Sequence, residues 1–211
     1  MTSDDIQFTT IRPAASTVLW RNGPTGPEVL MGQRGAQAAF MPSKYVFPGG
    51  AIDAADADMP RDVFLHPRCI QRLRLNCPDG APGPDAIVTA ALRELAEETG
   101  LHLSPGSSAG GGLRFIFRAI TPHGRSRRFD ARFLLADATN IIGNPNDFSA
   151  ASDELSHLHW VALTQARRLD LPFITEVVLA EIGHLLRKNQ DGDGVPFFDN
   201  SGPVPIFRRL I

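Results

Sequence analysis

A nine-residue acidic stretch constrains the fold of this chain more than any other feature. Residues 93–101 read Arg-Glu-Leu-Ala-Glu-Glu-Thr-Gly-Leu. If this stretch is helical, Glu94, Glu97 and Glu98 lie on one face, because residues three and four apart are neighbours on a helix. Gly100 then stands where helices commonly end in a left-handed residue. The pattern predicts a helix that carries three clustered carboxylates and ends at Gly100.

Three carboxylates within one helical turn favour a bound cation. Like charges at this spacing cost roughly 0.2–0.5 kcal/mol per pair, and a cation removes that cost. A site made of oxygen ligands suits Mg²⁺ or Mn²⁺ better than zinc. Arg93 precedes Glu97 by four residues and can orient it through a charge-assisted hydrogen bond. The alternative is an acidic helix face in contact with water, and the glutamates alone leave both interpretations open.

The acidic stretch closes a longer predicted helix that packs on a sheet. Asp85 is a suitable N-cap, and the helix is predicted to run from there to about Thr99. Residues at helical spacing form a stripe on a face away from the glutamates, which should be buried against a sheet. These residues are Val88, Leu92, Leu95 and Thr99.

The rest of the chain mixes strands with a second long helix. Apolar spacing predicts a helix that follows Pro172 and ends near Lys188, with shorter helical segments at 67–75 and 164–169. The sequence shows neither an internal repeat nor a linker between domains, so a single α/β domain over 1–211 is expected. Strands are predicted at 14–20, 28–33, 45–47, 113–120, 128–136 and 157–161.

Composition narrows the functional classes. Hydrophobic residues make up 43% of the 211 residues, enough for a core without disulfides. The net charge of -2 provides no field that would attract nucleic acid or a membrane surface. No apolar run approaches the roughly 20 residues that span a bilayer, and the N-terminus lacks the apolar run of a signal peptide. Cys69 and Cys77 have no zinc-site spacing. A cytoplasmic protein that binds neither nucleic acid nor membrane is expected.

Gly50 and the acidic stretch together resemble the Nudix box. That box reads Gly, five residues, Glu, seven residues, then Arg-Glu-apolar-x-Glu-Glu-x-Gly-apolar. Gly50 opens the pattern, and residues 93–101 close it without a mismatch. Asp56 stands where the box has glutamate, and 36 residues (57–92) replace the usual seven. The chain therefore resembles the Nudix hydrolase superfamily with an insertion of 29 residues, placed at about 57–84.

One subgroup of this superfamily carries an insertion at the same place. Residues 40–53 resemble the peroxisomal-type Nudix coenzyme A diphosphatases and their bacterial relatives, as do residues 120–122 and 127–133. The similarity runs from about residue 14 to residue 188. It implies a Nudix-type α/β/α sandwich with a mixed sheet and an insertion between the Gly-Gly loop and the Nudix helix.

The resemblance implies a hydrolase that splits the diphosphate linkage of a nucleoside diphosphate derivative, a small molecule. Coenzyme A or acyl-coenzyme A, giving 4′-phosphopantetheine and 3′,5′-ADP, is the first choice of substrate. ADP-ribose, dinucleotides and sugar nucleotides are the alternatives. A non-catalytic Nudix module that senses a ligand is an alternative of another class. Such modules usually lose box glutamates, and this chain keeps all three.

The resemblance also assigns roles within the box. Glu94, Glu97 and Glu98 should bind Mg²⁺ or Mn²⁺ together with the backbone carbonyl of Gly49, and Arg93 should support them. Glu94 is the first choice of general base. Glu154 is a second possible base, an extra metal ligand or a solvated loop carboxylate. Asp56 is expected to form a salt bridge with Arg93 or to contact the metal through an outer-shell water. Gly50 and Gly100 are expected to be structural glycines.

Substrate contacts are less constrained by the sequence. Arg34, Arg127 and Arg128 are candidates for phosphate contacts, because guanidinium groups match phosphate oxygens. Arg128, Asp130 and Arg132 alternate as one face of a strand would. For Arg127 and Arg128, cross-strand ion pairs, with the intervening phenylalanines in the core, are therefore an equal alternative. Phe40 is a candidate for stacking on a base, although packing within the protein is the more common role. The insertion is expected to form a lid or a homodimer surface, or to be a passive excursion.

Overall fold

The structure is a computed structural model that describes residues 10–58, 65–105, 112–188 and 194–211. It contains nine strands: β1 (Ile11–Gly23), β2 (Gly26–Arg34), β3 (Tyr45–Val46), β4 (Gly49–Ala51), β5 (Arg114–Ile120), β6 (Arg128–Asp137), β7 (Leu155–Ala162), β8 (Val195–Asp199) and β9 (Ile206–Leu210).

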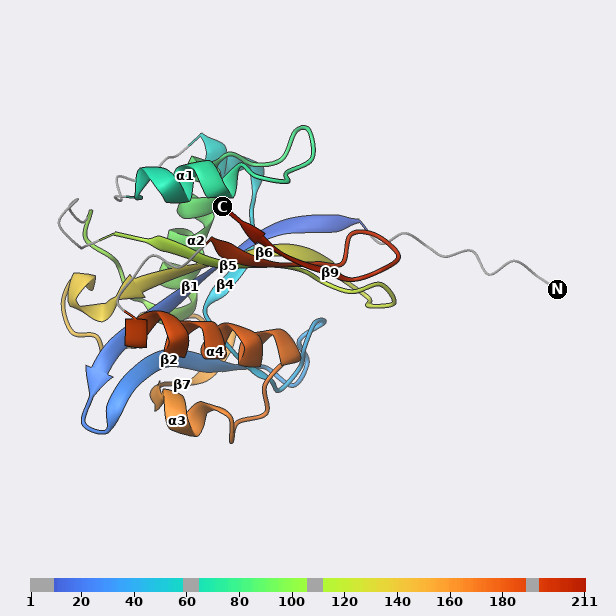
Figure 1. The fold of residues 1–211 in the computed structure, drawn as a ribbon. Coiled ribbons are helices and arrows are strands. Elements are labelled where there is room, and N and C mark those ends of the chain that lie inside the picture. The colour runs from blue at the N-terminus through green and yellow to red at the C-terminus, as the bar shows by residue number, and fades with distance from the viewer. Residues whose placement is uncertain (1–9, 59–64, 106–111, 189–193) are drawn as a thin grey trace.

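The strands form one mixed sheet that runs through the middle of the molecule (Figure 1). The main order is β3-β2-β1-β6-β5-β8-β9, with β4 beside β1 and β7 beside β2. The pairs β1–β6 and β5–β8 are parallel, and the remaining pairs are antiparallel. β1 has partners on both sides: it pairs with β6 from Ile11 to Trp20, with β4 at residues 14–16, and with β2 from Trp20 onward.

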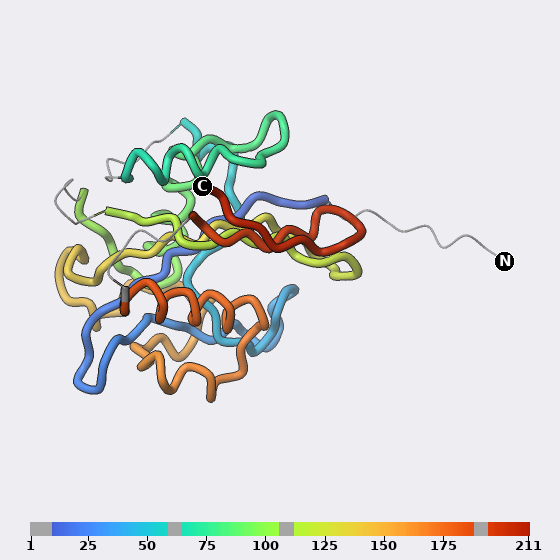
Figure 2. The backbone as a smooth tube through the Cα atoms, in the orientation of Figure 1, coloured from blue at the N-terminus to red at the C-terminus, as the bar shows by residue number. Residues whose placement is uncertain are grey.

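Helices cover both faces of this sheet. On one face lie α1 (Pro67–Leu73) and α2 (Pro84–Thr99), and on the other lie α3 (Leu163–Ala166) and α4 (Phe173–Lys188). Figure 2 traces the same layers along the backbone. Two short 3-10 turns complete the list, η1 (Ala54–Ala57) and η2 (Ala138–Asn140). The predicted α/β/α sandwich with a mixed sheet is confirmed. Among the described residues, no helix has both the length and the apolar character needed to cross a membrane.

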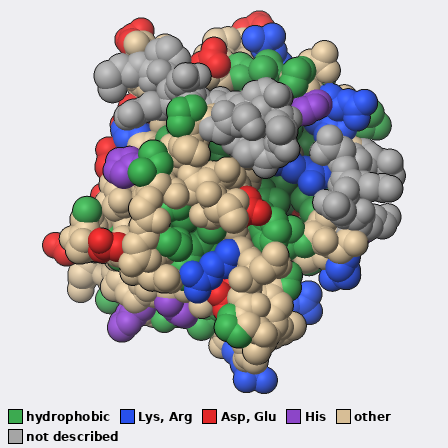
Figure 3. Space-filling model, turned by 90° about the vertical axis from the view of Figure 1, so that its left-hand side faces the viewer, with side chains coloured by type: hydrophobic (Ala, Val, Ile, Leu, Met, Phe, Trp, Pro, Cys, Tyr) green, Lys and Arg blue, Asp and Glu red, His purple; other side chains and the backbone are tan. Residues whose placement is uncertain are grey.

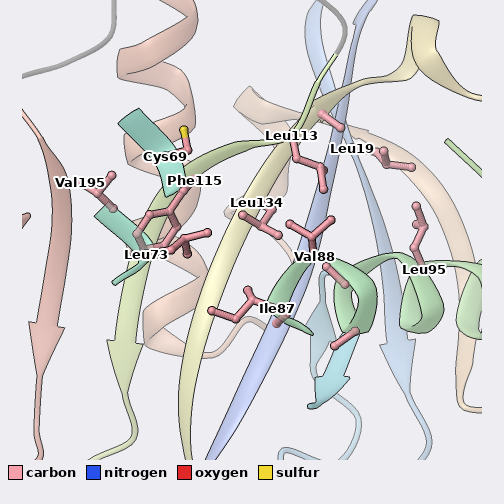
Figure 4. Packing of buried hydrophobic residues seen from close by; sticks show 14 of the residues in the cluster. Leu19, Cys69, Leu73, Ile87, Val88, Leu95, Leu113, Phe115, Leu134 and Val195 are labelled. Carbon is pink, nitrogen blue, oxygen red and sulfur yellow. The ribbon is translucent and has the colours of Figure 1, made fainter. Parts of the chain in front are cut away.

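Two buried clusters hold the layers together, one on each face of the sheet. Figure 4 shows the cluster on the α2 face, where Ile87, Val88 and Leu95 pack against strand residues that include Leu19 and Leu134. Val88 and Leu95 belong to the stripe predicted from helical spacing. The second cluster joins α4 to the opposite face of the sheet. Since both faces are buried, the central strands lack the alternation of a half-exposed sheet.

The N-cap of helix α2 lies two residues earlier than the sequence suggested. Pro84 occupies its first turn and Gly83 is the N-cap, so the prediction of Asp85 as the cap is wrong. Proline suits the first helical position because the missing N–H has no intrahelical partner there. Asp85 instead lies inside the first turn, where its negative charge interacts favourably with the helix dipole. The C-terminal prediction is confirmed: Gly100 has a left-handed φ of 73° and donates its N–H to Ala96.

The described part of the insertion is built into the core. Cys69 and Leu73 of α1 are buried in the cluster on the α2 face (Figure 4). Arg118 of β5 donates from Nη1 to the carbonyls of Leu75 at 2.9 Å and Asn76 at 3.2 Å, which fixes the segment after α1. The insertion is therefore not a passive excursion here. Residues 59–64 lie outside the described residues, and a role as lid or dimer surface stays a prediction.

The hairpin of β8 and β9 was not predicted from the sequence. It joins the sheet through parallel pairing with β5, where Arg118 lies opposite Phe197. Each strand has five residues, and Pro196 and two adjacent arginines interrupt the apolar pattern. A pattern this short cannot be separated from a loop by periodicity. The short strand β4, with two glycines in three residues, was missed for the same reason.

Side chains of both charge signs are exposed on the face shown in Figure 3. Figure 3 shows acidic, basic, histidine and hydrophobic side chains intermixed on the described part of one face. This distribution agrees with the small net charge of the chain.

Candidate active site

The Gly-Gly segment, Gly49 and Gly50, lies between the strand β1 and the helix α2. Gly49 and Gly50 pair with Ser16 and Ala15 of β1, and Pro48 accepts a hydrogen bond from Thr17 N at 2.9 Å. A Cβ added to Gly50 would lie 2.4 Å from the carboxyl carbon of Glu94. Such a distance is too short for any side chain. The helix carboxylate rests directly on the loop backbone, so a side chain at position 50 would force the Glu94 carboxylate to move.

Glu98 is the most enclosed of the three glutamates. Its side chain accepts a hydrogen bond from Gly49 N at 2.7 Å, and the residue is only 2% exposed. Burial raises the pKa of Glu98 to about 8, although the Gly49 N–H and the charge of Arg34 oppose this shift. A proton therefore occupies this carboxyl group near neutral pH unless a cation takes its place.

Arg93 bridges the other two glutamates. Its Nη1 donates to Glu94 Oε1 at 2.8 Å and to Glu97 Oε2 at 3.1 Å. Burial raises the pKa of Glu94, and the hydrogen bond from Arg93 opposes the shift. Glu97 is more accessible, with 55% of its side chain exposed. The guanidinium group thus fixes the orientation of both carboxylates from one side.

Asp56 holds Arg93 from the opposite side. Arg93 Nε and Nη2 donate to the two oxygens of Asp56 at 3.0 and 3.1 Å, and Nη2 also donates to Ala51 O at 3.1 Å. Asp56 is 2% exposed and accepts a further hydrogen bond from Asp53 N at 2.8 Å. The hydrogen bonding of Arg93 to Asp56 is the main cause of the raised pKa of Arg93. The salt bridge expected from the sequence is present despite the shorter side chain.

The three glutamates have the oxygen donors that a hard divalent ion prefers, but their side chains are not gathered around one point. Among the described residues, no three His, Cys, Asp or Glu side chains converge closely enough to form a metal site. Arg93 donates to one oxygen of Glu94 and one of Glu97, and the Gly49 N–H donates to one oxygen of Glu98. The second oxygen of each glutamate accepts no hydrogen bond from the described residues. Glu94, Glu97 and Glu98 therefore offer three oxygen ligands on one helical face, which suits Mg²⁺ or Mn²⁺. Coordination by the Gly49 carbonyl stays a prediction.

Two further predicted residues lie near this helix. The charge of Arg34 lowers the pKa of Glu98, so this residue at the end of β2 acts on the site electrostatically. Its Nε is buried and has no hydrogen-bond partner in the part of the chain that the structure describes. The charge of Glu154 raises the pKa of both Glu94 and Glu98. Both residues can therefore act on a ligand held by the glutamates.

Gly100 serves the site as well as the helix end. A Cβ at this position would lie 2.9 Å from the side chain of Ala150. The loop that leads to Glu154 crosses the end of α2 at this point. Ser152 N donates to Glu97 O at 2.9 Å in the same region. The absence of a side chain at Gly100 therefore lets that loop approach the helix.

The other predicted substrate contacts do not gather at the glutamates. Arg128 is 3% exposed and donates to the carbonyls of Thr121 and Asn200 at 3.0 and 2.6 Å. Its guanidinium group is thus used within the protein, which contradicts a role as a free phosphate contact. Phe40 packs edge-on against Phe129, with ring centroids 5.1 Å apart, as the packing alternative predicted. Arg127 is exposed, and its phosphate contact stays a prediction.

A buried ionic cluster partly escaped sequence reasoning. Asp130 binds Arg118 across the sheet at 2.7 Å and Arg132 at 3.0 Å. Cross-strand ion pairs were the alternative role for Arg128, but its guanidinium group donates to backbone carbonyls instead. The pair across the strands is that of Asp130 with Arg118, and Arg132 contacts Asp130 within β6. Arg118 was missed, although a single arginine within an apolar strand is a signal for a buried partner. The cluster ties the sheet to the insertion, because Arg118 also binds the backbone after α1.

The comparisons with known proteins agree with this geometry. A family model described as the NUDIX domain matches residues 61–182. The acyl-coenzyme A diphosphatase NUDT19 of Gallus gallus is 38% identical over 104 residues, which cover 40% of this chain and 28% of that protein. The putative nudix hydrolase 7 of Caenorhabditis elegans is 27% identical over 159 residues, 71% of this chain and 51% of that protein. These matches thus span about half or less of the relatives' own lengths.

Among solved structures, the NUDIX hydrolase of Alicyclobacillus acidocaldarius superposes with a TM-score of 0.59 at 28% identity. The superposition covers 82% of this chain and 91% of that one.

Proposed function

Since the chain belongs to the Nudix family of hydrolases, we propose that it cleaves coenzyme A or acyl-coenzyme A at the diphosphate linkage in the presence of Mg²⁺ or Mn²⁺. The products would be 4′-phosphopantetheine, acylated or free, and 3′,5′-ADP. The observation that carries the diphosphatase activity is the set of three glutamates against the Gly-Gly backbone, each with one carboxylate oxygen free of protein donors in the described structure.

The choice of coenzyme A rests on narrower support. Residues 40–53 and the insertion inside the box resemble the coenzyme A diphosphatase subgroup. The Gallus gallus relative is named an acyl-coenzyme A diphosphatase. ADP-ribose, dinucleotides and sugar nucleotides contain the same diphosphate and are the alternative substrates. These alternative substrates differ from coenzyme A in the chemical groups attached to the diphosphate, which the site must also bind.

The chain's own residues would each have a defined task. The bound metal ion would supply charge neutralisation of the diphosphate and a water molecule of lowered pKa. Glu94, Glu97 and Glu98 would bind the ion, and Gly49 N–H would hold the Glu98 carboxylate in place. Arg93, anchored by Asp56, would keep Glu94 and Glu97 oriented. A guanidinium donor from Arg34 would bind a phosphate oxygen, because its Nε has no protein acceptor in the described structure.

The proton of the attacking water needs a carboxylate acceptor. Glu94 is the first candidate, since its raised pKa brings it closer to the value suited to a base near neutral pH. Glu154 is the second candidate, and its exposure leaves it free to accept a proton. As water adds to one phosphorus, the bond from that phosphorus to the bridging oxygen breaks. The bridging oxygen leaves with the other phosphate.

A substrate panel tests this function. Purified protein is incubated with coenzyme A, acetyl-coenzyme A, ADP-ribose, NADH and diadenosine polyphosphates, with Mg²⁺ and with Mn²⁺, and the products are identified by mass spectrometry. The expected result is 3′,5′-ADP formation from the coenzyme A species at the highest kcat/KM. Preferred cleavage of another substrate would refute the coenzyme A choice. Absence of turnover on the whole panel, with retained ligand binding, would favour a sensing module.

A further inference from the structure

The loop from residue 141 to residue 154 joins η2 to β7 and ends at Glu154. Its first part is fixed near the end of α2, where Ile142 N donates to His102 O at 2.8 Å. Its last part is fixed to the same helix, where Ser152 N donates to Glu97 O at 2.9 Å. A single residue, Asp153, therefore separates Glu154 from Ser152, whose backbone contacts a metal-ligand candidate.

The middle of this loop is held by side chains of the sheet strands β7 and β1. Trp160 of β7 donates from Nε1 to Pro145 O at 3.0 Å. Arg21 of β1 donates from Nη1 to Asn146 Oδ1 at 2.9 Å. The guanidinium carbon of Arg21 lies 4.3 Å from the centre of the Trp160 ring, a cation–π contact. We call Arg21, Asn146 and Trp160 the loop clamp.

The clamp itself is firmly attached to the sheet. Arg21 Nε forms an ion pair with Glu28 Oε2 at 2.8 Å, across the β1–β2 hairpin. Trp160 pairs with Leu30 in the ladder between β7 and β2. The indole and guanidinium groups thus project from paired strands, which are more rigid supports than loops. The loop is held at its middle by strands and at both ends by the α2 region.

Glu154 lies between two of these fixed points. Ser152 precedes it and binds α2, while Leu155 follows it, is buried, and pairs with Arg34 of β2. The side chain of Glu154 itself is exposed and forms no salt bridge within the described residues. The backbone around it is therefore restrained while its carboxylate stays available.

We propose that the loop clamp is a positioning device for Glu154, which it holds beside the glutamates of α2 for catalysis. Arg21, Asn146 and Trp160 are positioning residues, because they act only through the loop. The inference rests on the proposed diphosphatase function and adds a role that the Nudix box does not contain. A displacement of about 1 Å in a reacting group can lower a rate by 100-fold, so fixing a loop of this length matters for turnover.

Single substitutions separate the clamp from the fold. Trp160→Phe keeps an aromatic ring against Arg21 and removes only the indole donor to Pro145. Asn146→Ala removes the acceptor of Arg21 from an exposed position, with little risk to folding. Trp20→Phe is the matched control, because Trp20 packs with the cluster on the α4 face and its indole donates no hydrogen bond within the described residues. Steady-state kinetics with the preferred substrate of the panel provide the readout.

The expected result is a loss in kcat with little change in KM. Trp160→Phe and Asn146→Ala should each lower kcat by about tenfold and change KM less than about twofold, whereas Trp20→Phe should keep the wild-type kcat. Glu154→Gln should lower kcat by about 100-fold, the range of a lost acid–base group. The double variant Trp160→Phe/Glu154→Gln should be within about twofold of Glu154→Gln alone, because the clamp acts through Glu154.

Two results would overturn the inference. One is an unchanged kcat in both Trp160→Phe and Asn146→Ala. The other is a double variant whose loss equals the product of the two single losses, which would make the clamp independent of Glu154. Failure of the diphosphatase function is distinguishable from both, since it would appear as absent turnover in the wild-type protein.

Discussion

The salt bridge between Asp56 and Arg93 gives the sharpest quantitative prediction. Asp56→Asn preserves the shape of the side chain and removes its charge. It also places an amide NH₂ against either Arg93 or the Asp53 N–H, both of which are donors. The variant therefore leaves a buried cation with a weaker partner and a donor facing a donor. Such a loss is more costly than the loss of an exposed ion pair.

The magnitude follows from the geometry. Charges 3.0 Å apart attract by about 5 kcal/mol at an effective dielectric constant near 20. Removing one partner of a buried pair typically costs about 3–5 kcal/mol. The Arg93 side chain is 20% exposed and keeps Glu94 and Glu97 as partners, which places the expected loss near the low end, at about 3 kcal/mol. For a chain of this size the Tm should fall by about 6–12 °C.

Urea unfolding and thermal scans of the metal-free protein measure this loss. Asp53→Asn is the matched control, because Asp53 faces the same arginine at 3.7 Å with 63% of its side chain exposed. Exposed pairs contribute about 0–1 kcal/mol, so the control should change stability by less than about 1 kcal/mol. Equal stability of wild type, Asp56→Asn and Asp53→Asn would refute the assignment of Asp56 as the anchor of Arg93.

Two further predictions concern the glycine loop and pH. Gly50→Ala places a methyl group 2.4 Å from the carboxyl carbon of Glu94 and should lower kcat by about 100-fold. Gly202→Ala, whose Cβ meets nothing within 4 Å, should keep wild-type turnover. Equal kcat values for the two variants would contradict the close approach of Glu94 to Gly50. Burial raises the pKa of Glu98 from 4.5 to about 8. Between pH 4.5 and about pH 8, the folded metal-free protein therefore binds up to one more proton than the unfolded chain. The free energy of unfolding should consequently fall as the pH rises through this range. Mg²⁺ must displace that proton, so its affinity, measured by calorimetry, should rise by up to about tenfold per pH unit from pH 6 to 8; a flat profile would contradict the assignment.

The sequence was sufficient for the parts of the site that follow helical geometry. Glu94, Glu97 and Glu98 lie three and four residues apart, so their shared face follows from the helix alone. Gly100 ends that helix as expected, since its left-handed φ favours glycine. The ion pair of Asp56 and Arg93 could be expected because the box pattern places an acidic residue there. These features depend on local spacing or on a short motif.

Features that depend on distant packing were not accessible in the same way. The loop clamp joins Arg21 to Asn146, which are 125 residues apart in the chain. Arg118 binds both Asp130 and the insertion backbone, and no local spacing relates the three. The β8–β9 hairpin is recognisable only once β5 offers it an edge. The role of Arg128 was left open between a phosphate contact and an ion pair, because its burial against Thr121 and Asn200 cannot be derived from strand alternation alone.

The central claim is that the glutamates of α2 bind a divalent ion and that this binding supports diphosphate hydrolysis. Calorimetric titration of Mg²⁺ and Mn²⁺ into the wild-type protein and Glu97→Gln, with turnover measured on the same samples, tests it most directly. The wild type is expected to bind the ion. Glu97→Gln is expected to keep its fold but to lose at least about tenfold in metal affinity and orders of magnitude in kcat. Absent binding by the wild type, or a Glu97→Gln variant that binds and turns over like it, would contradict the account.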